Sequence, residues 1–286
     1  MTGGLMRRRR LTDRAMRALI WGALAVAITP LVWILVDVAK MGAGALRGTQ
    51  FFTQGPPGDP SSPGGGALNG IVGTLIMVGL AAAMAVPMGI LGAVYLAEFG
   101  RASRFARAVG FFADVMAGIP SIVFGIFVFS LVVVTTRSFS ALAGAMALAL
   151  IMWPVILRTS EEMIRLVPGE IREAAYALGV PRWRTILKVV LPTAASGIAT
   201  GVMLGVARAA GETAPLLFTA LGNQFVSTRL DQPMSALPLE IFRGATTAYG
   251  SAQERAWAAA LTLIGLVLAL TLGGRALVAR RAGGRS

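Results

Sequence analysis

Six apolar runs divide the chain, and a helix of about 20 apolar residues is long enough to cross the hydrocarbon core of a membrane. The composition agrees, because 56% of the 286 residues are hydrophobic and only 14% are charged, against about 25% in soluble domains. The sequence therefore predicts an all-α membrane protein. Its six transmembrane helices are predicted at residues 18–39, 68–97, 109–134, 139–157, 193–219 and 256–279.

A basic N-terminus, Arg7 to Arg10, precedes the first apolar run, and the same pattern begins a cleaved signal peptide. Here the apolar residues continue through Val36, well past the usual core of a signal peptide. We therefore expect an uncleaved first span, with a cleaved leader as the alternative.

Basic residues concentrate in alternate segments between the spans. The chain carries 26 Lys and Arg against 13 Asp and Glu, and such residues gather on the cytoplasmic side of membrane proteins. They are frequent at both termini, between spans two and three, and between spans four and five. This pattern predicts cytoplasmic termini in a bacterial inner membrane, with residues 41–67 and 220–255 outside. Nucleic-acid binding fits poorly, since no single polar domain holds the basic residues.

Several residue types needed for catalysis are missing from the chain. It has no Cys and no His, which removes thiolate nucleophiles, imidazole bases and most zinc or haem sites. It also lacks the Gly-Lys-Ser or Gly-Lys-Thr sequence of a P-loop. We therefore expect no enzyme activity, no metal and no cofactor.

The most informative segment lies between spans four and five, at residues 173–192, EAAYALGVPRWRTILKVVLP. Gly179 suits a helix end because it tolerates left-handed backbone angles. Pro181 is disfavoured inside a helix but suits the start of the next one. The pattern predicts a helix, a tight turn and a second helix that runs to Pro192.

This segment resembles the signature of permease subunits in binding-protein-dependent ABC importers. That signature is Glu-Ala-Ala, three residues, Gly, nine residues, then Ile-x-Leu-Pro, and the chain departs from it only by Val at position 189. The resemblance implies an all-α, six-helix type I ABC importer permease whose loop couples to an ATPase subunit. The residues that match are Glu173, Ala174, Ala175, Gly179, Val189, Leu191 and Pro192.

Three further stretches look like the phosphate permeases of this family. They are GIPSIVFGIF (118–127), ALGVPRWRTILKVVLPTAASGI (177–198) and ARAAGETAPLLFTA (207–220). The resemblance implies a subunit that passes inorganic phosphate and has no ATPase of its own. It also implies a second, PstC-like permease subunit, two PstB-like ATPase subunits and an external PstS-like phosphate-binding protein.

With this resemblance the chain divides into four segments. We expect a basic cytoplasmic N-terminus (1–17), a first span with its external loop (18–67), a permease core (68–279) and a cytoplasmic tail (280–286). The core includes the coupling loop at 158–192. Residues 55–66, GPPGDPSSPGGG, are expected to be a flexible linker, and segment 220–255 to dip into the membrane or cover the pathway.

Span five carries two charges, Arg208 and Glu212, inside an apolar run. A charge at this depth costs about 3 kcal/mol and normally faces a bundle interior or a watery path. The i,i+4 spacing lets the two side chains pair on one helix face. They lie beside a stripe of small residues that allows close helix contact, namely Gly197, Gly201, Gly205 and Ala209.

The pair has two interpretations. Arg208 offers a planar fork of donors that fits phosphate oxygens, with Glu212 holding the arginine in place. A structural ion pair between helices is the alternative. The resemblance assigns Arg208 and Glu212 to the transport path, and we place Thr213 and Ser121 there with them. Ser121 follows Gly118 and Pro120, which either open span three or merely kink it.

Other transport functions remain open at this stage. Another importer permease, for molybdate, sulfate or a sugar, is one alternative, although Arg208 argues against a neutral substrate. A secondary transporter is a second, but the paired repeats of such proteins are not evident. A channel or a membrane enzyme is a third, without any constellation of catalytic side chains.

Overall fold

The computed structural model describes residues 3–46, 48–100 and 103–283, the first six and last seven of these by backbone alone. The outermost ends of the predicted N-terminal segment and tail lie outside the described residues. Within this part of the chain every regular element is helical, and three short stretches, labelled η, are π-helical. In order, the elements are α1 (Gly3–Ala45), α2 (Gln50–Thr53), α3 (Leu68–Val94), η1 (Tyr95–Phe99), α4 (Arg104–Gly118), α5 (Ser121–Val128), η2 (Phe129–Val133), α6 (Val134–Thr136), α7 (Ala141–Arg165), α8 (Gly169–Ala177), α9 (Arg182–Thr185), η3 (Ile186–Val190), α10 (Leu191–Ala210), α11 (Ala214–Thr219), α12 (Leu237–Ala245) and α13 (Gly250–Gly283).

The prediction of six spans agrees with these helices. In the described part, five helices are long and apolar enough to cross a membrane, and a bent pair, Arg104–Gly118 with Ser121–Thr136, supplies a sixth if it counts as one span. The helix that holds span four extends to Arg165, beyond the predicted end at 157. The chain is thus an all-α, multi-pass membrane protein.

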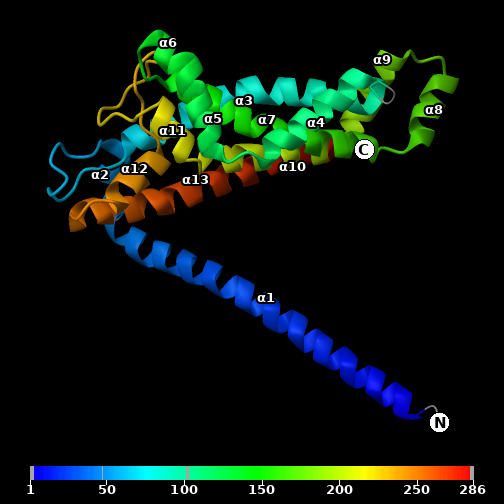
Figure 1. Cartoon of the computed structure of the whole chain (residues 1–286), viewed down its shortest axis with the longest axis horizontal. Coiled ribbons are helices and arrows are strands. Elements are labelled where there is room, and N and C mark those ends of the chain that lie inside the picture. The colour runs from blue at the N-terminus through cyan, green and yellow to red at the C-terminus, as the bar shows by residue number, and fades with distance from the viewer. Residues whose placement is uncertain (1–2, 47, 101–102, 284–286) are drawn as a thin grey trace.

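Helix α7 lies at the centre of the bundle, between α3 and α10 (Figure 1). Its Ile156 is fully buried and meets a glycine on each neighbour, Gly89 of α3 and Gly205 of α10. Since glycines have no side chain, the three backbones approach closely at this level. Small residues therefore set the spacing of the core.

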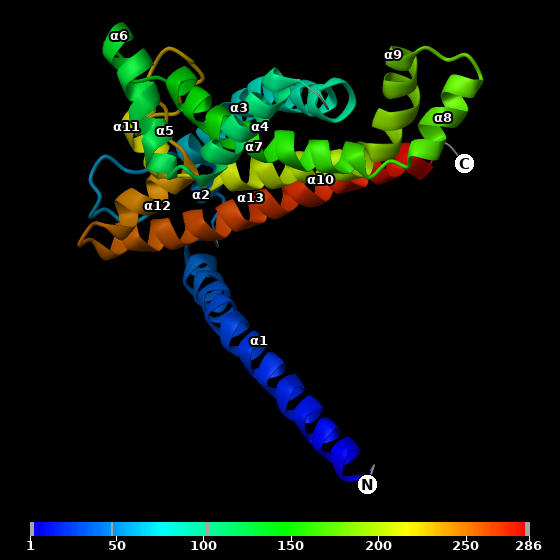
Figure 2. The ribbon, with the colours of Figure 1, turned by 45° about the vertical axis from the view of Figure 1, so that its right-hand side comes forward.

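The two ends of the bundle differ in structure (Figures 1 and 2). Helices α8 and α9 project at one end, which we call the α8/α9 end. Helices α2, α11 and α12 gather at the other, the α12 end. Helix α13 runs between the two ends, and α1 leaves the bundle at the α12 end and diverges from it.

Segment 220–255 contains α12 and lies at the α12 end of the bundle. Its helix α12 packs against α3 and α13, and Gly73 of α3 leaves no room for a side chain beside Ser235. Thr74 Oγ1 accepts a hydrogen bond of 2.8 Å from the Leu237 amide at the start of α12. The segment therefore packs into the bundle.

The Gly- and Pro-rich stretch 55–66 differs from the flexible linker expected from its composition. Arg255 of α13 donates hydrogen bonds to the carbonyls of Pro60, Ser62 and Gly64, at 2.8 to 3.1 Å. Ser251 Oγ donates to the carbonyl of Pro60 at 2.9 Å. The Gly- and Pro-rich composition suggested a flexible linker, whereas α13, far along the chain, supplies donors that fix its carbonyls.

Candidate functional site

Span three is broken and not merely kinked, so the interpretation as a simple proline kink is wrong. Helix α4 ends at Gly118, α5 begins at Ser121, and the two helix axes differ by 106°. Ile119 and Pro120 between them have extended backbone angles. Pro120 disfavours the helical region for the residue before it, which explains why the helix stops there. Ser121, one of the predicted pathway residues, is half-buried in the first turn of α5.

Span five is broken as well, which corrects the prediction of one continuous helix over 193–219. Helix α10 ends at Ala210 and α11 begins at Ala214. Glu212 and Thr213 therefore lie in the break, both half-buried. Pro215 occupies the first turn of α11, where its missing N–H is tolerated, and does not kink a longer helix.

The two broken spans meet each other through α5 and α11. A β-carbon on Gly125 of α5 would lie 2.6 Å from the Cα of Pro215 in α11. Ser121 opens α5 and Thr213 immediately precedes α11, so these two predicted residues lie at the starts of helices that pack together. The predicted pathway residue Glu212 lies in the same break as Thr213, and Arg208 lies in the last turn of α10 just before it.

Arg208 and Glu212 form a loose ion pair. Arg208 Nε and Glu212 Oε1 are 3.8 Å apart, and the side chains are 46% and 16% exposed. This distance is beyond hydrogen-bond range. The pairing expected from the sequence is present, although Glu212 lies past the helix end and not on the same helix. Among the described residues, none is hydrogen-bonded to the guanidinium of Arg208.

The predicted glycine stripe of span five packs against α7. A β-carbon on Gly197 would collide with Met163, one on Gly201 with Thr159, and one on Gly205 would press on Ile156. The stripe continues into Ala209 and Ala210, which are buried. Arg208 is therefore carried by a helix that is fixed tightly to the centre of the bundle, and it lies beside the packed face of that helix.

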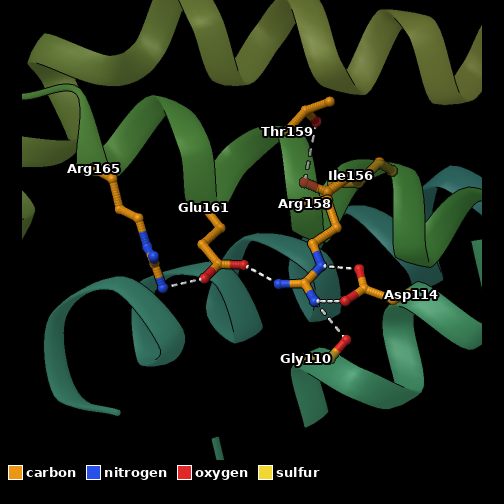
Figure 3. A network of polar contacts seen from close by, with 7 residues as sticks. All are labelled: Gly110, Asp114, Ile156, Arg158, Thr159, Glu161 and Arg165. Atoms are coloured by element: carbon orange, nitrogen blue, oxygen red, sulfur yellow. Dashed lines mark hydrogen bonds and ion pairs between the residues drawn. The ribbon is translucent and has the colours of Figure 1, made fainter. Parts of the chain in front are cut away.

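A second polar cluster joins α4 to α7 (Figure 3). Arg158 donates to Asp114 through Nε and Nη2, at 2.7 and 2.5 Å, and to the Gly110 carbonyl at 2.6 Å. Its Nη1 donates to Glu161 at 2.7 Å, and Glu161 also accepts from Arg165 at 2.6 Å. The donors of Arg158 are thus occupied by protein groups, unlike those of Arg208.

Sequence reasoning missed this cluster because it assigned Arg158 and Arg165 to the basic loop after span four. A signal was present: positions 158, 161 and 165 share one helix face if the span is extended by two turns.

No group of three or more acidic side chains in the described residues could hold a metal ion.

The helix-turn-helix predicted at 173–192 is confirmed, and we call residues 169–185 the helical hairpin. Gly179 has a φ of 75°, and the Val180 amide donates to the Ala175 carbonyl at 3.1 Å, as in a glycine-ended helix. A wide π turn, η3, then leads into α10. The four predicted coupling residues lie together here, with Ala175 buried and Glu173, Ala174 and Gly179 exposed.

Large apolar side chains are exposed around this turn. Leu178 is 84% exposed, and Tyr176, Trp183 and Leu187 are exposed as well. An exposed apolar patch on a projecting element is typical of a protein interaction site. The hairpin therefore has the form of a docking surface.

Comparison with solved structures identifies the fold. A chain from "Inward facing conformations of the MetNI methionine ABC transporter" aligns with a TM-score of 0.62 and 19% identity, over 75% of this chain and 95% of the other. A bacterial ABC transporter involved in the import of the acidic polysaccharide alginate aligns with a TM-score of 0.53 and 17% identity, over 95% and 99%. This is the fold of type I ABC importer permeases.

Curated relatives are similar over nearly the whole chain, and three bear the name phosphate transport system permease protein PstA or PstA 1. The protein of Yersinia pestis is 41% identical over 273 residues, which cover 96% of this chain and 92% of the relative. That of Xylella fastidiosa (strain Temecula1) is 46% identical, over 80% of each. PstA 1 of Mycobacterium tuberculosis (strain H37Rv) is 43% identical, over 93% and 87%.

The match to a family model covers most of the core. The model, described as "Binding-protein-dependent transport system inner membrane component", aligns with residues 85–283. That range includes both broken spans, the helical hairpin and the Arg158 cluster. The chain therefore belongs to the binding-protein-dependent transport system inner membrane component family, as a PstA-like permease subunit.

Proposed function

We propose that this chain forms half of the membrane pathway of an ATP-driven importer of inorganic phosphate. The observation that carries the proposal is Arg208, a guanidinium on a membrane-spanning helix whose side chain is 46% exposed and whose nearest acidic group is 3.8 Å away. The relatives of this chain that are named PstA support phosphate as the substrate. A second permease subunit supplies the other half of the pathway.

Arg208 is suited to a passing anion because its fork of donors matches the oxygens of phosphate. Glu212 lies close enough to orient the guanidinium and carries the charge that opposes a second anion. A site that bound phosphate too tightly would release it slowly. The nearby carboxylate repels the anion and so favours its release. In the proposal, Thr213 and Ser121 contribute hydroxyl groups at the two breaks.

The helical hairpin faces the cytoplasm in this proposal, and both termini lie on that side, including residues 1–17 and 280–286. Glu173, Ala174, Ala175 and Gly179 form the surface on which an ATPase subunit docks. The assembly contains a PstC-like permease, two PstB-like ATPase subunits and a PstS-like phosphate-binding protein. The last of these would meet the α12 end, where residues 55–66 and 220–255 lie.

Two alternatives differ in substrate and in energy source. The Arg208 fork would accept sulfate or molybdate by the same geometry, so a comparison of anions is required. Broken helices also occur in secondary transporters, but membership in the binding-protein-dependent family favours transport driven by ATP.

The experiment is reconstitution of the intact complex, including the binding protein, in vesicles. We expect ATP hydrolysis and uptake of radiolabelled phosphate to rise together when phosphate is added. Sulfate and molybdate, presented with the same complex, should stimulate neither. Stimulation by molybdate or sulfate and not by phosphate would assign another oxyanion. Uptake of phosphate without ATP would contradict the ATP-driven mechanism.

A further inference from the structure

A buried ion pair connects the helical hairpin with the end of α3. Glu98, in the π-helical turn η1 that ends α3, has a side chain only 5% exposed, and its partner Arg172 in α8 is 12% exposed. Arg172 Nη2 and Nε both donate to Glu98 Oε1, at 2.8 and 3.1 Å. The two residues are 74 positions apart, so the pair links separate elements.

The same guanidinium also fastens the end of α7. Arg172 Nη1 donates to the Val167 carbonyl at 2.5 Å, and Nη2 to the Ile164 carbonyl at 2.8 Å. The Ile164 carbonyl lies in the last turn of α7 and the Val167 carbonyl just beyond it, where helices leave acceptors unpaired. One side chain of the hairpin thus joins α3 and α7.

Helix α9, the second helix of the hairpin, attaches to the same point at the end of α3. Arg182, at the start of α9, donates through Nη2 to the backbone carbonyl of Glu98. Its guanidinium also lies over the ring of Phe99, 4.6 Å from the centroid. Arg172 holds the carboxylate of Glu98 and Arg182 holds its carbonyl, so both limbs attach at one residue.

A buried ion pair is a poor way to gain stability, because apolar residues of similar size often stabilise a fold equally well. Its directional hydrogen bonds do fix geometry, since a planar guanidinium bound to four acceptors has little freedom to turn. The exposed pair Arg17–Asp13, by contrast, joins residues of one helix and links no two helices.

We propose that Glu98 is a positioning residue that makes the hairpin and the end of α3 one rigid unit, so that movement of the hairpin is passed directly into the membrane. This inference rests on the proposed function, in which an ATPase moves the hairpin. Glu98 needs to touch neither substrate nor ATPase. Its role is to prevent the hairpin from moving alone.

The test measures phosphate imported per ATP hydrolysed in the reconstituted complex, for Glu98→Gln, Arg172→Lys and the control Arg17→Gln. Glu98→Gln keeps the shape and removes the charge. We expect ATPase subunits to remain bound and hydrolysis to continue, while the ratio of transport to hydrolysis falls about tenfold, within the usual range of coupling between sites. Arg172→Lys should lower the ratio too, and Arg17→Gln should leave it unchanged.

The ratio separates the possible outcomes, because a fold defect lowers transport and hydrolysis together. An unchanged ratio in Glu98→Gln would overturn the proposal. Loss of the ATPase subunits from both variants would also overturn it, since the pair would then serve docking alone. If the wild-type complex binds no ATPase, that result contradicts the proposed function and not the role of Glu98.

A distance measurement provides an independent check that does not depend on transport. The chain has no cysteine, so spin labels can be placed at Leu91→Cys on α3 and Leu178→Cys on the hairpin, both exposed positions. In an otherwise unchanged complex the distance distribution should stay narrow with and without ATP. Adding Glu98→Gln should broaden it, and an equally narrow distribution would contradict the role of Glu98 in making the unit rigid.

Discussion

Gly125 of α5 lies directly against the backbone of Pro215 in α11, with no space for a side chain between them. Helix α5 follows the break in span three, and α11 follows the end of α10, the helix of span five. The contact therefore brings the two interruptions of the bundle together. The predicted pathway residues Ser121 and Thr213 are placed by this contact, although neither takes part in it.

Replacing Gly125 by Ala should disturb this junction. The new methyl group would lie 2.6 Å from the Pro215 Cα, and overpacking of this kind costs about 1–3 kcal/mol. We expect phosphate uptake to fall several-fold while the complex still assembles. Gly118→Ala is the matched control, because a β-carbon there meets nothing within 4 Å. Equal uptake by the two variants would contradict a role for the contact.

The helices and the hairpin were predictable because their signals are local. Apolar runs define the spans, and Gly179 with Pro181 defines the turn. The breaks were less accessible, since a proline in an apolar run is compatible with a kink or with a full interruption. The extent of the break at Pro120 depends on packing between α5 and α11, which no short stretch of sequence encodes.

The polar contacts also differ in how far the sequence predicts them. The Arg208–Glu212 pair follows from i,i+4 spacing and is present, although the helix ends between its two members. The Glu98–Arg172 pair joins residues 74 positions apart, so neither residue alone signals it. Whether Arg208 meets an anion stays a prediction from chemistry.

The orientation in the membrane can be tested with single cysteines, because the natural chain has none. Leu178 on the hairpin is 84% exposed and Phe225 near the α12 end is 79% exposed, so both are accessible to a reagent. In intact cells a membrane-impermeant maleimide should label Phe225→Cys and not Leu178→Cys. Labelling of Leu178→Cys before the cells are opened would reverse the proposed topology.

Gly179 should be sensitive to substitution for a reason of backbone geometry alone. Its φ is 75°, and a β-carbon there would meet nothing within 4 Å. An L-residue in the left-handed region costs about 1–2 kcal/mol, so Gly179→Ala should distort the hairpin turn. We expect less ATPase to copurify with the permease, while insertion in the membrane is normal.

Gly169→Ala supplies the control for that experiment, since position 169 has equal space and an ordinary backbone. It should retain the ATPase at the wild-type level. Retention of the ATPase by Gly179→Ala, with normal uptake, would argue against docking at this turn.

The central claim is that Arg208 binds the anion in transit, and uptake by Arg208→Gln and Glu212→Gln tests it most directly. Removing hydrogen bonds to a charged group costs about 1.5–3 kcal/mol, so Arg208→Gln should lower phosphate uptake per assembled complex at least about tenfold. Arg208→Lys should restore part of it, because an ammonium lacks the bidentate fork.

Glu212→Gln removes the other member of the same pair, which separates an anion site from a structural ion pair. With ATPase retention as the measure of assembly, the account predicts that Glu212→Gln still transports phosphate while Arg208→Gln does not. An equal loss of uptake in both variants, or wild-type uptake in Arg208→Gln, would contradict it and make the pair a structural one.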